Sequence, residues 1–280
     1  MSKFTMLKNM SNNKVITIAL ALVLSVTGAL LIYNFGGLKE ARIVNGLVAR
    51  NIAARGGLQA WQDVTSLRLT GRMDLGQGMV VPYVLEQKRP SKMCFEFVFD
   101  EQTALQCADG RSGWKVAPFR GRDIAEPMTK VELRETADST DLYGLLYDYA
   151  DRGTDVEVLG HETVGGRDAI KLKLTLAKGG VRWLYLDAQT ALEIKMEALR
   201  TIAGHKRRVE TVYSDWKEQN GLLIAHRQET TTEGDPKSHF LTVESVTVNP
   251  EIDDSRFAMP ATASANHGSI KKGSIKKALL

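Results

Sequence analysis

The chain has 280 residues, of which 43% are hydrophobic and 25% are charged, so disorder along its whole length is excluded. The formal net charge of +4 overstates its basic character, because seven lysines lie near the two ends. Without them, 30 of the 37 basic residues remain against 33 acidic ones, about −3. Nucleic-acid binding needs clustered basic residues, so we expect no nucleic-acid partner.

An uncharged apolar run covers residues 15–33 and follows only positive charges, at Lys3, Lys8 and Lys14. Its length lies between that of a secretory signal and that of a membrane-spanning helix. An uncleaved inner-membrane anchor and a cleaved signal both stay open, with a buried helix as a third interpretation. The first two place the body outside the cytoplasm. We expect an anchor or signal segment at residues 1–37, a folded domain at 38–262 and a disordered basic tail at 263–280.

The residues after this run have a helical pattern. Apolar side chains recur at Ile43, Leu47 and Ile52, which predicts a helix from residue 39 that Gly56 and Gly57 interrupt before a further turn to residue 61.

Strand patterns begin at residue 65, because apolar and polar residues alternate from there. A helical interlude is expected at residues 129–149, where Leu142, Leu145, Leu146 and Tyr149 are spaced as one helix face and Asp141 resembles an N-cap. We expect this interlude to cross the concave side of the sheet, although packing on the outer face stays open. The first group of strands is expected at 65–72, 79–87, 92–99, 103–108 and 114–116, with an irregular segment at 119–127.

The stretch from residue 168 to residue 198 has the clearest strand pattern, with a hairpin signal at Gly179 and Gly180. Many strands and few helices give a mainly β (α+β) fold. We expect a curved antiparallel sheet, or incomplete β-barrel, closed by helices on its concave side. The second group of strands is expected at 154–159, 168–176, 181–186, 192–198, 206–216, 222–232 and 240–248.

The sequence contains no motif that predicts catalysis. The five histidines stand far apart, and no Cys-x-x-Cys pair, Gly-x-Ser-x-Gly elbow, phosphate loop or dinucleotide fingerprint occurs. Strand carboxylates such as Glu193 and Glu197 are expected to be exposed. We therefore expect no catalytic residues, no metal site and no cofactor.

The two cysteines lie in neighbouring predicted strands, and two registers are open. One pairs Cys94 with Cys107 and permits a disulfide, but sets Leu105 against Glu96. The other pairs Phe97 with Leu105 and sends the two sulfur atoms to opposite faces. Matching of apolar residues favours the second register.

A set of short segments in order resembles the LolA/LolB-like superfamily of outer-membrane lipoprotein-sorting proteins, over roughly residues 40–260. The segments are 51–61, 66–73, 88–93, 109–114, 165–169, 185–187, 213–216, 220–223 and 253–260. The resemblance implies an incomplete, strongly curved β-barrel closed by helices. It also implies a non-enzymatic periplasmic role, in which acyl chains of lipoproteins or other lipids are held in an apolar cavity.

Apolar residues of the expected strands and interlude are candidates for the lining of such a cavity, and an ordinary core position is the alternative for each. They are Phe95, Phe97, Phe99, Trp114, Val116, Leu142, Leu145, Leu146, Ile170, Leu172, Leu174, Trp183, Ile194 and Met196.

The sequence leaves two further functions open. One is an envelope-stress sensor or protein-interaction module of the same fold. The other is a hydrolase of lipid or envelope polymer, with His161 and His226 as residues to test.

Overall fold

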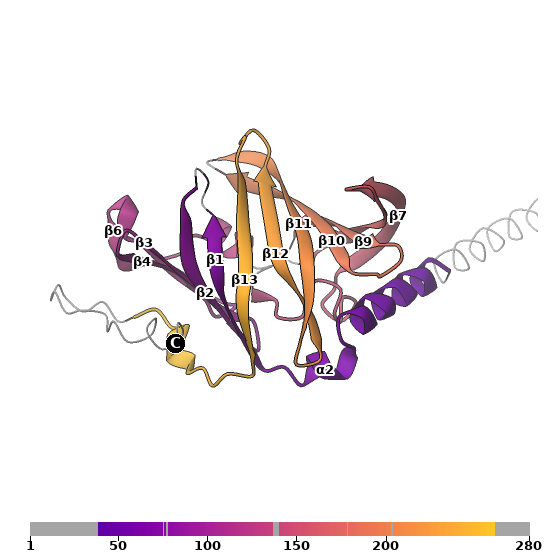
Figure 1. The fold of residues 1–280 in the computed structure, drawn as a ribbon, viewed down its shortest axis with the longest axis horizontal. Coiled ribbons are helices and arrows are strands. Elements are labelled where there is room, and N and C mark those ends of the chain that lie inside the picture. Colours follow the sequence, from indigo (N-terminus) through magenta and orange to yellow (C-terminus); the bar gives the residue numbers. More distant parts are fainter. Residues whose placement is uncertain are drawn as a thin grey trace, which may run out of the picture. The chain divides into compact units, whose positions relative to one another are not determined.

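The computed structural model describes residues 39–260, except residues 75, 77, 137–139, 178 and 203. The chain divides into two compact units, residues 1–47 and 48–280. In the first unit, the described residues 39–47 are helical; the second contains the rest of this helix, to residue 54, and every labelled strand (Figure 1). The predicted membrane segment at 15–33 and the predicted tail at 263–280 lie outside the described residues. Within the described part, no helix has the length and apolar character needed to cross a bilayer.

Thirteen strands form one antiparallel sheet in the order β6-β5-β4-β3-β2-β1-β13-β12-β11-β10-β9-β8-β7. In the described part of the chain the outermost strands, β6 and β7, do not pair with each other. This confirms a mainly β fold with an incompletely closed antiparallel sheet. The strands are β1 Ser66–Asp74, β2 Val80–Lys88, β3 Lys92–Phe99, β4 Gln102–Ala108, β5 Gly113–Ala117, β6 Arg122–Pro127, β7 Asp155–Val164, β8 Arg167–Thr175, β9 Val181–Asp187, β10 Glu193–Ile202, β11 His205–Gln219, β12 Leu222–Thr232 and β13 Ser238–Val248.

Strand β6 lies in the segment that the sequence predicted to be irregular, so that prediction was wrong. The prolines and glycines that suggested a loop are tolerated here because β6 is an edge strand with one neighbour, β5. The helical prediction at the start of the domain is confirmed: residues 39–54 are helical, and a short helix, α2 (Leu58–Gln62), follows the break at Gly56 and Gly57.

The register assigns each strand residue to one of two faces, since facing residues of paired strands share a face. We call the face that carries Leu67 and Leu69 of β1 the inner face. It continues through Phe95 of β3 in one direction and reaches Leu184 and Leu172 of β9 and β8 in the other.

Residues 128–154, which we call the crossing segment, connect β6 to β7 and so link the two opposite edges of the sheet. Among the described residues of this connection, helix is present in α3 (Lys130–Glu135), where Thr129 and Glu132 form a capping box, and at Thr140. Residues 141–153 form turns, so the predicted helix through residue 149 was wrong. Gly144 and Asp148 adopt positive φ values of 90° and 48°, which an α-helix does not accommodate.

Helix α3 reveals how strongly the sheet curves. Glu132 pairs with Lys115 of β5, and Glu135 accepts hydrogen bonds from Arg200 and Thr201 of β10. Eight strand-to-strand steps separate β5 from β10 in the sheet, roughly 38 Å if it were flat. The helix has six residues and is only about 9 Å long. The sheet must therefore bend around α3, with its inner face concave, and the crossing segment covers that face as the first of the two sequence interpretations predicted.

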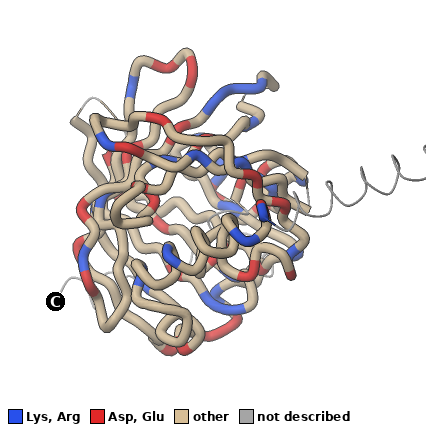
Figure 2. The backbone as a smooth tube through the Cα atoms, turned by 90° about the vertical axis from the view of Figure 1, so that its right-hand side faces the viewer, with Lys and Arg blue, Asp and Glu red and all other residues tan. Residues whose placement is uncertain are grey.

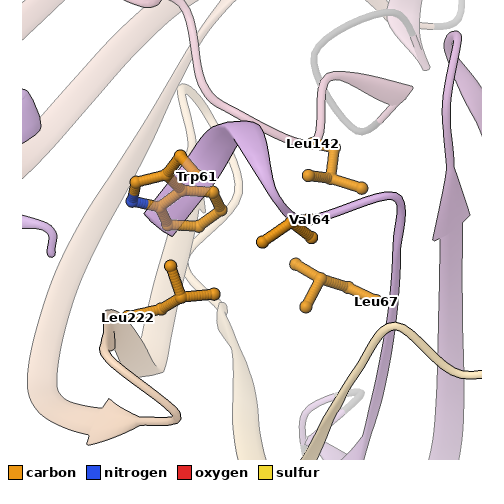
Figure 3. Packing of buried hydrophobic residues seen from close by; sticks show 5 residues of the cluster. All are labelled: Trp61, Val64, Leu67, Leu142 and Leu222. Carbon is orange, nitrogen blue, oxygen red and sulfur yellow. The ribbon is translucent and has the colours of Figure 1, made fainter. Parts of the chain in front are cut away.

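A cluster of buried apolar residues closes one end of the inner face (Figure 3). Trp61 of α2 and Val64 pack with Leu67, Leu222 and Leu142, the last from the crossing segment. These residues are far apart in the sequence, so burial of their side chains fixes the crossing segment against both β1 and β12.

The outer face of β3–β5 is covered by the chain after β13. Ile252 and Phe257 pack on Cys94, Cys107 and Trp114, and the Trp114 indole N–H donates to the Phe257 carbonyl at 2.9 Å. The short 3-10 helix η2 (Asp254–Arg256) lies in this segment.

The strands β3 and β4 adopt the register that places Cys94 opposite Cys107, and the two form a disulfide. The register favoured by matching apolar residues was wrong. Glu96 does face Leu105, but its carboxylate receives the Arg256 guanidinium at 2.5 Å. This ion pair joins two residues that are 160 positions apart in the sequence. It allows the charge of Glu96 to be buried beside a leucine.

Basic and acidic residues are interspersed along the backbone in the view of Figure 2. The sequence predicted that the strand carboxylates are exposed, but this is not true of all of them. Glu197 of β10 is buried on the outer face, where it accepts from the Tyr185 hydroxyl at 2.8 Å and from Lys195 at 2.6 Å. Burial acts to raise the pKa of Glu197, but the hydrogen bonds from Lys195 and Tyr185 prevail and lower it.

Candidate functional site

Five aromatic rings form a continuous row on the inner face over β2 and β3. Tyr83 stacks on Phe95 with ring centroids 5.5 Å apart, and Phe95 lies 6.1 Å from Phe97. Phe119, in the 3-10 helix η1 (Pro118–Arg120) after β5, lies 5.7 Å from Phe97 and 6.3 Å from Phe99. We call these five residues the aromatic row.

Exposure falls along the aromatic row from its outer end to its inner end. Phe119 is 41% exposed, Phe95, Phe97 and Phe99 are half-buried, and Tyr83 is 4% exposed. Burial, aided by the negative charge of Glu244, raises the pKa of Tyr83, so its hydroxyl stays protonated at neutral pH. The row therefore offers a neutral, apolar path from solvent into the inner face.

The inner face over β8 and β9 differs from the aromatic row. Leu172, Leu174 and Leu184 are fully buried, and Ile170 is nearly so. Met196 of β10 faces Leu184 and is half-buried. The apolar inner face is thus covered at β8 and β9 and partly open to solvent at β2 and β3.

Four of the predicted lining residues lie on the outer face. Trp114 faces Cys107, and Val116 faces Leu105, so both lie beneath the segment after β13. Trp183 faces Lys173, and Ile194 packs with Tyr185, which faces Lys171. Trp114, Val116, Trp183 and Ile194 therefore belong to outer-face clusters and share no lining with Phe97 or Leu172.

The crossing segment supplies the remaining three candidates. Leu142 and Leu146 are buried, and Leu145 is half-buried. Leu142 belongs to the cluster with Trp61 and therefore contributes to the closed end of the inner face.

Two residues of the aromatic row, Tyr83 and Phe119, were missed by the sequence analysis. Val81, Tyr83 and Leu85 occupy every second position of this strand, and that period could have identified Tyr83. Phe119 lies in a 3-10 helix, and its contact with Phe97 has no periodic signal in the sequence.

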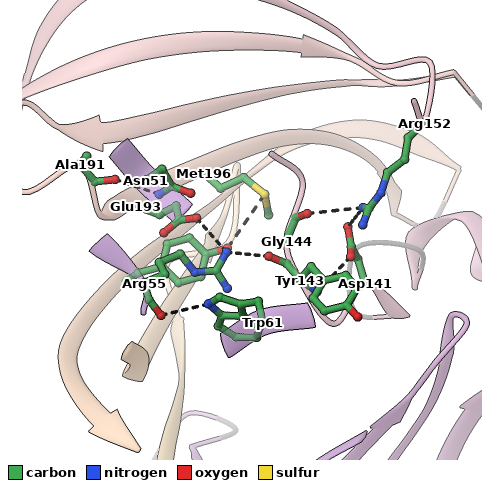
Figure 4. A network of polar contacts seen from close by, with 11 residues as sticks. Asn51, Arg55, Trp61, Asp141, Tyr143, Gly144, Arg152, Ala191, Glu193 and Met196 are labelled. Atoms are coloured by element: carbon green, nitrogen blue, oxygen red, sulfur yellow. Dashed lines mark hydrogen bonds and ion pairs between the residues drawn. The ribbon is translucent and has the colours of Figure 1, made fainter. Parts of the chain in front are cut away.

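A polar network holds the crossing segment against the end of the first helix (Figure 4). Arg55 donates to the Tyr143 carbonyl at 2.7 Å, and its guanidinium lies 4.5 Å from the Trp61 ring centre. Within the segment, Arg152 donates to Asp141 at 2.5 Å. Burial raises the pKa of Asp141, although the charge of Arg152 opposes the change. These contacts fix the loop at 141–152 at the closed end of the inner face.

The histidines that sequence reasoning selected for a hydrolase are not brought together. His161 lies on β7 and contacts Asp168 at 2.9 Å in an exposed pair. His226 lies on β12, is buried, and contacts the Val243 carbonyl through Nδ1. Four strands separate β7 from β12 in the sheet. Among the described residues, no group of three or more His, Cys, Asp or Glu side chains is arranged to hold a metal ion.

A small hollow lies around Gly71 and Pro82, where most of the lining side chains belong to the outer face. It shares only Tyr83 and Phe97 with the aromatic row. The lining residues are Thr70, Gly71, Arg72, Pro82, Tyr83, Val84, Glu96, Phe97, Val98 and Glu244.

The fold is similar to that of solved LolA-superfamily structures, as the sequence resemblance implied. A LolA superfamily protein from Nitrosomonas europaea superposes with a TM-score of 0.54 at 14% identity, covering 77% of this chain and 97% of that one. A domain named for outer-membrane lipoprotein sorting, from Vibrio parahaemolyticus, gives 0.51 at 14% identity, covering 78% and 96%. A DUF1329 family protein from Desulfovibrio piger gives 0.54 at 11% identity, covering 77% and 97%. No family model and no curated protein matches the sequence.

Proposed function

We propose that this chain binds lipid, holding an acyl chain along the aromatic row, and that it serves outer-membrane lipoprotein sorting in the periplasm. The observation that carries the proposal is the half-exposed state of Phe95, Phe97 and Phe99 on a concave apolar face. Covering these rings with hydrocarbon removes apolar surface from water, and each buried methylene contributes about 0.8 kcal/mol. The fold shared with a lipoprotein-sorting domain supports the same role.

Binding rather than catalysis is the chemistry that we assign to this site. An acyl chain needs only a dry apolar surface of sufficient length, and the row from Phe119 to Tyr83 supplies one without any charged side chain among its members. The neutral hydroxyl of Tyr83 at the buried end is compatible with an uncharged ligand.

Two measurements test lipid binding. Native mass spectrometry of the purified whole chain is expected to reveal co-purified lipid, and titration with a dansyl-labelled fatty acid to give saturable fluorescence. Phe97→Ser removes about 1 kcal/mol of apolar contact and so weakens binding roughly fivefold. Val98→Ser, its neighbour on the opposite face, is the matched control and leaves affinity unchanged. Equal effects of the two variants, or no bound lipid and no saturation, contradict the proposal; a stable protein complex in their place favours the interaction module.

We also propose that residues 15–33 anchor the chain in the inner membrane with the folded domain in the periplasm. The basic residues before this run support that orientation. Intact-mass analysis of the mature protein distinguishes the alternatives: an uncleaved chain retains residues 15–33, and a cleaved signal is absent.

A further inference from the structure

The acidic side chains of helix α3 lie on the side of the helix that faces the sheet. Glu132 pairs with Lys115, and Glu135 lies 3.4 Å from the Arg200 guanidinium, which also donates to the Glu135 carbonyl at 2.7 Å. The hydrogen bond from Lys115, with that from the Thr129 amide, lowers the pKa of Glu132 to about 2. Glu132 is therefore charged and engaged at neutral pH, and Glu135 is engaged by Arg200.

The exposed side of α3 is basic and apolar as a result. Lys130 and Arg134 are exposed and make no ion pair with another described residue, and Val131 between them is 37% exposed. A six-residue helix whose two acids face the protein thus presents two cations and one aliphatic side chain to solvent.

The hairpin of β10 and β11 extends this surface. Glu135 accepts from the Thr201 amide, and Thr201 faces Lys206 across the hairpin. The next residue, Ile202, is 41% exposed, and Lys206 is exposed as well. We call Lys130, Val131, Arg134 and Ile202 the α3 patch.

We propose that the α3 patch docks the protein on the surface of an anionic phospholipid bilayer. Exposed cations beside exposed aliphatic side chains match both parts of such a surface, because the charges attract anionic headgroups and the apolar side chains enter the interface. An acidic protein would satisfy the cations but not Val131 and Ile202, so the bilayer is the occupant that the patch fits.

The position of the patch agrees with this partner. Strands β5 and β10 run in the same direction, because an even number of antiparallel steps separates them in the sheet. The end of β10 at Ile202 and the end of β5 before Phe119 therefore lie at the same strand-end edge of the sheet. Phe119, with exposed Arg120 beside it, begins the aromatic row. A bilayer docked at this edge lies next to the exposed end of the row, but docking does not require that the row binds lipid.

The test uses the whole chain with an environment-sensitive NBD label at His205→Cys, an exposed site in the same hairpin. The labelled thiol is unique because the chain's two native cysteines are bonded to each other. With phosphatidylcholine vesicles containing phosphatidylglycerol, we expect a blue shift and quenching by brominated lipid, both reversed by high salt. Pure phosphatidylcholine gives neither, and a label at Arg111→Cys, in the turn at the opposite edge, responds to neither vesicle.

Charge variants identify the residues responsible. Each basic residue near an anionic surface contributes about 1 kcal/mol, so Lys130→Gln with Arg134→Gln lowers the ratio of docked to undocked α3 patch roughly 30-fold. The matched control, Arg111→Gln with Lys217→Gln, removes two exposed charges elsewhere and leaves the ratio unchanged. A label at residue 205 that stays silent with anionic vesicles overturns the proposal, as does a response only to polyglutamate in solution, which indicates an acidic protein instead. Fatty-acid titration of the same samples reports separately on the aromatic row.

Discussion

Replacing Arg256 with alanine is the most informative perturbation of the fold, because this side chain bridges two buried carboxylates. Its guanidinium donates to Glu86 at 2.6 Å and to Glu96 at 2.5 Å, and the two glutamates are 6% and 8% exposed. Arg256→Ala leaves Glu86 with its second partner, Arg68, at 2.8 Å. Glu96 has no other ion-pair partner among the described residues, so the variant strands a buried charge.

The expected loss follows from that stranded charge. Breaking a buried ion pair by removing one partner costs about 3–5 kcal/mol. For a domain of this size, each kcal/mol lowers the melting temperature by about 2–4 °C, so Arg256→Ala is expected to melt roughly 6–20 °C below the wild type. Thermal unfolding followed by circular dichroism measures the change. Adding Glu96→Gln to Arg256→Ala removes the stranded charge and is expected to recover part of the loss.

The matched control is Arg72→Ala, which removes another arginine–glutamate pair. Arg72 and Glu244 lie 3.1 Å apart, but their side chains are 59% and 53% exposed. Exposed pairs contribute at most about 1 kcal/mol, so this variant is expected to melt within about 4 °C of the wild type. Equal melting temperatures for Arg256→Ala and Arg72→Ala would refute the assignment of Glu96 to a buried outer face.

Three further predictions concern backbone, charge and cross-link. Gly56→Ala is expected to destabilise the fold more than Gly57→Ala. Both residues have positive φ, but only at Gly56 does an added Cβ meet a backbone oxygen, at 2.1 Å. Chemical denaturation measures the two losses of unfolding free energy, and equal losses contradict the prediction. The pKa of Glu132 is lowered from 4.5 to about 2, so its ion pair stabilises the fold above pH 4.5 and is lost as pH falls toward 2. The unfolding free energies of wild type and Glu132→Gln should therefore converge between pH 4.5 and 2. A difference that stays constant over this range would contradict the ion pair. Replacing Cys94 and Cys107 with alanine opens a cross-link of sequence separation 13 and is expected to cost about 3 kcal/mol of unfolding free energy in urea, whereas an unchanged midpoint excludes a stabilising disulfide.

The strands that were predicted correctly have a local signal. Residues 170–176 and 192–198 alternate strictly between apolar and polar, and such a period is set by the chain itself. The helix break at Gly56 and Gly57 was predictable for the same reason, because glycine reaches positive φ without strain.

The features that sequence reasoning missed depend on contacts between distant residues. Alternation predicts that Trp183 and Leu172 each lie in a strand. It does not say whether the two side chains lie on the same face of the sheet, because that depends on how the strands pair. Glu96 opposite Leu105 was rejected because Arg256, which neutralises it, comes 160 residues later. The spacing of Leu142, Leu145 and Leu146 fitted a helix, yet Gly144 turns the chain where Arg55 contacts it.

The central claim is that hydrocarbon lies along the aromatic row, and photo-crosslinking tests it most directly. A fatty acid with a diazirine near its methyl end is bound to the whole chain, irradiated, and located by mass spectrometry of the digested protein. We expect labelled peptides to contain Phe95, Phe97 or Phe119, with labelling abolished by excess unlabelled fatty acid. Label confined to β8–β10 or to the outer face, or label that excess fatty acid does not displace, would contradict the claim.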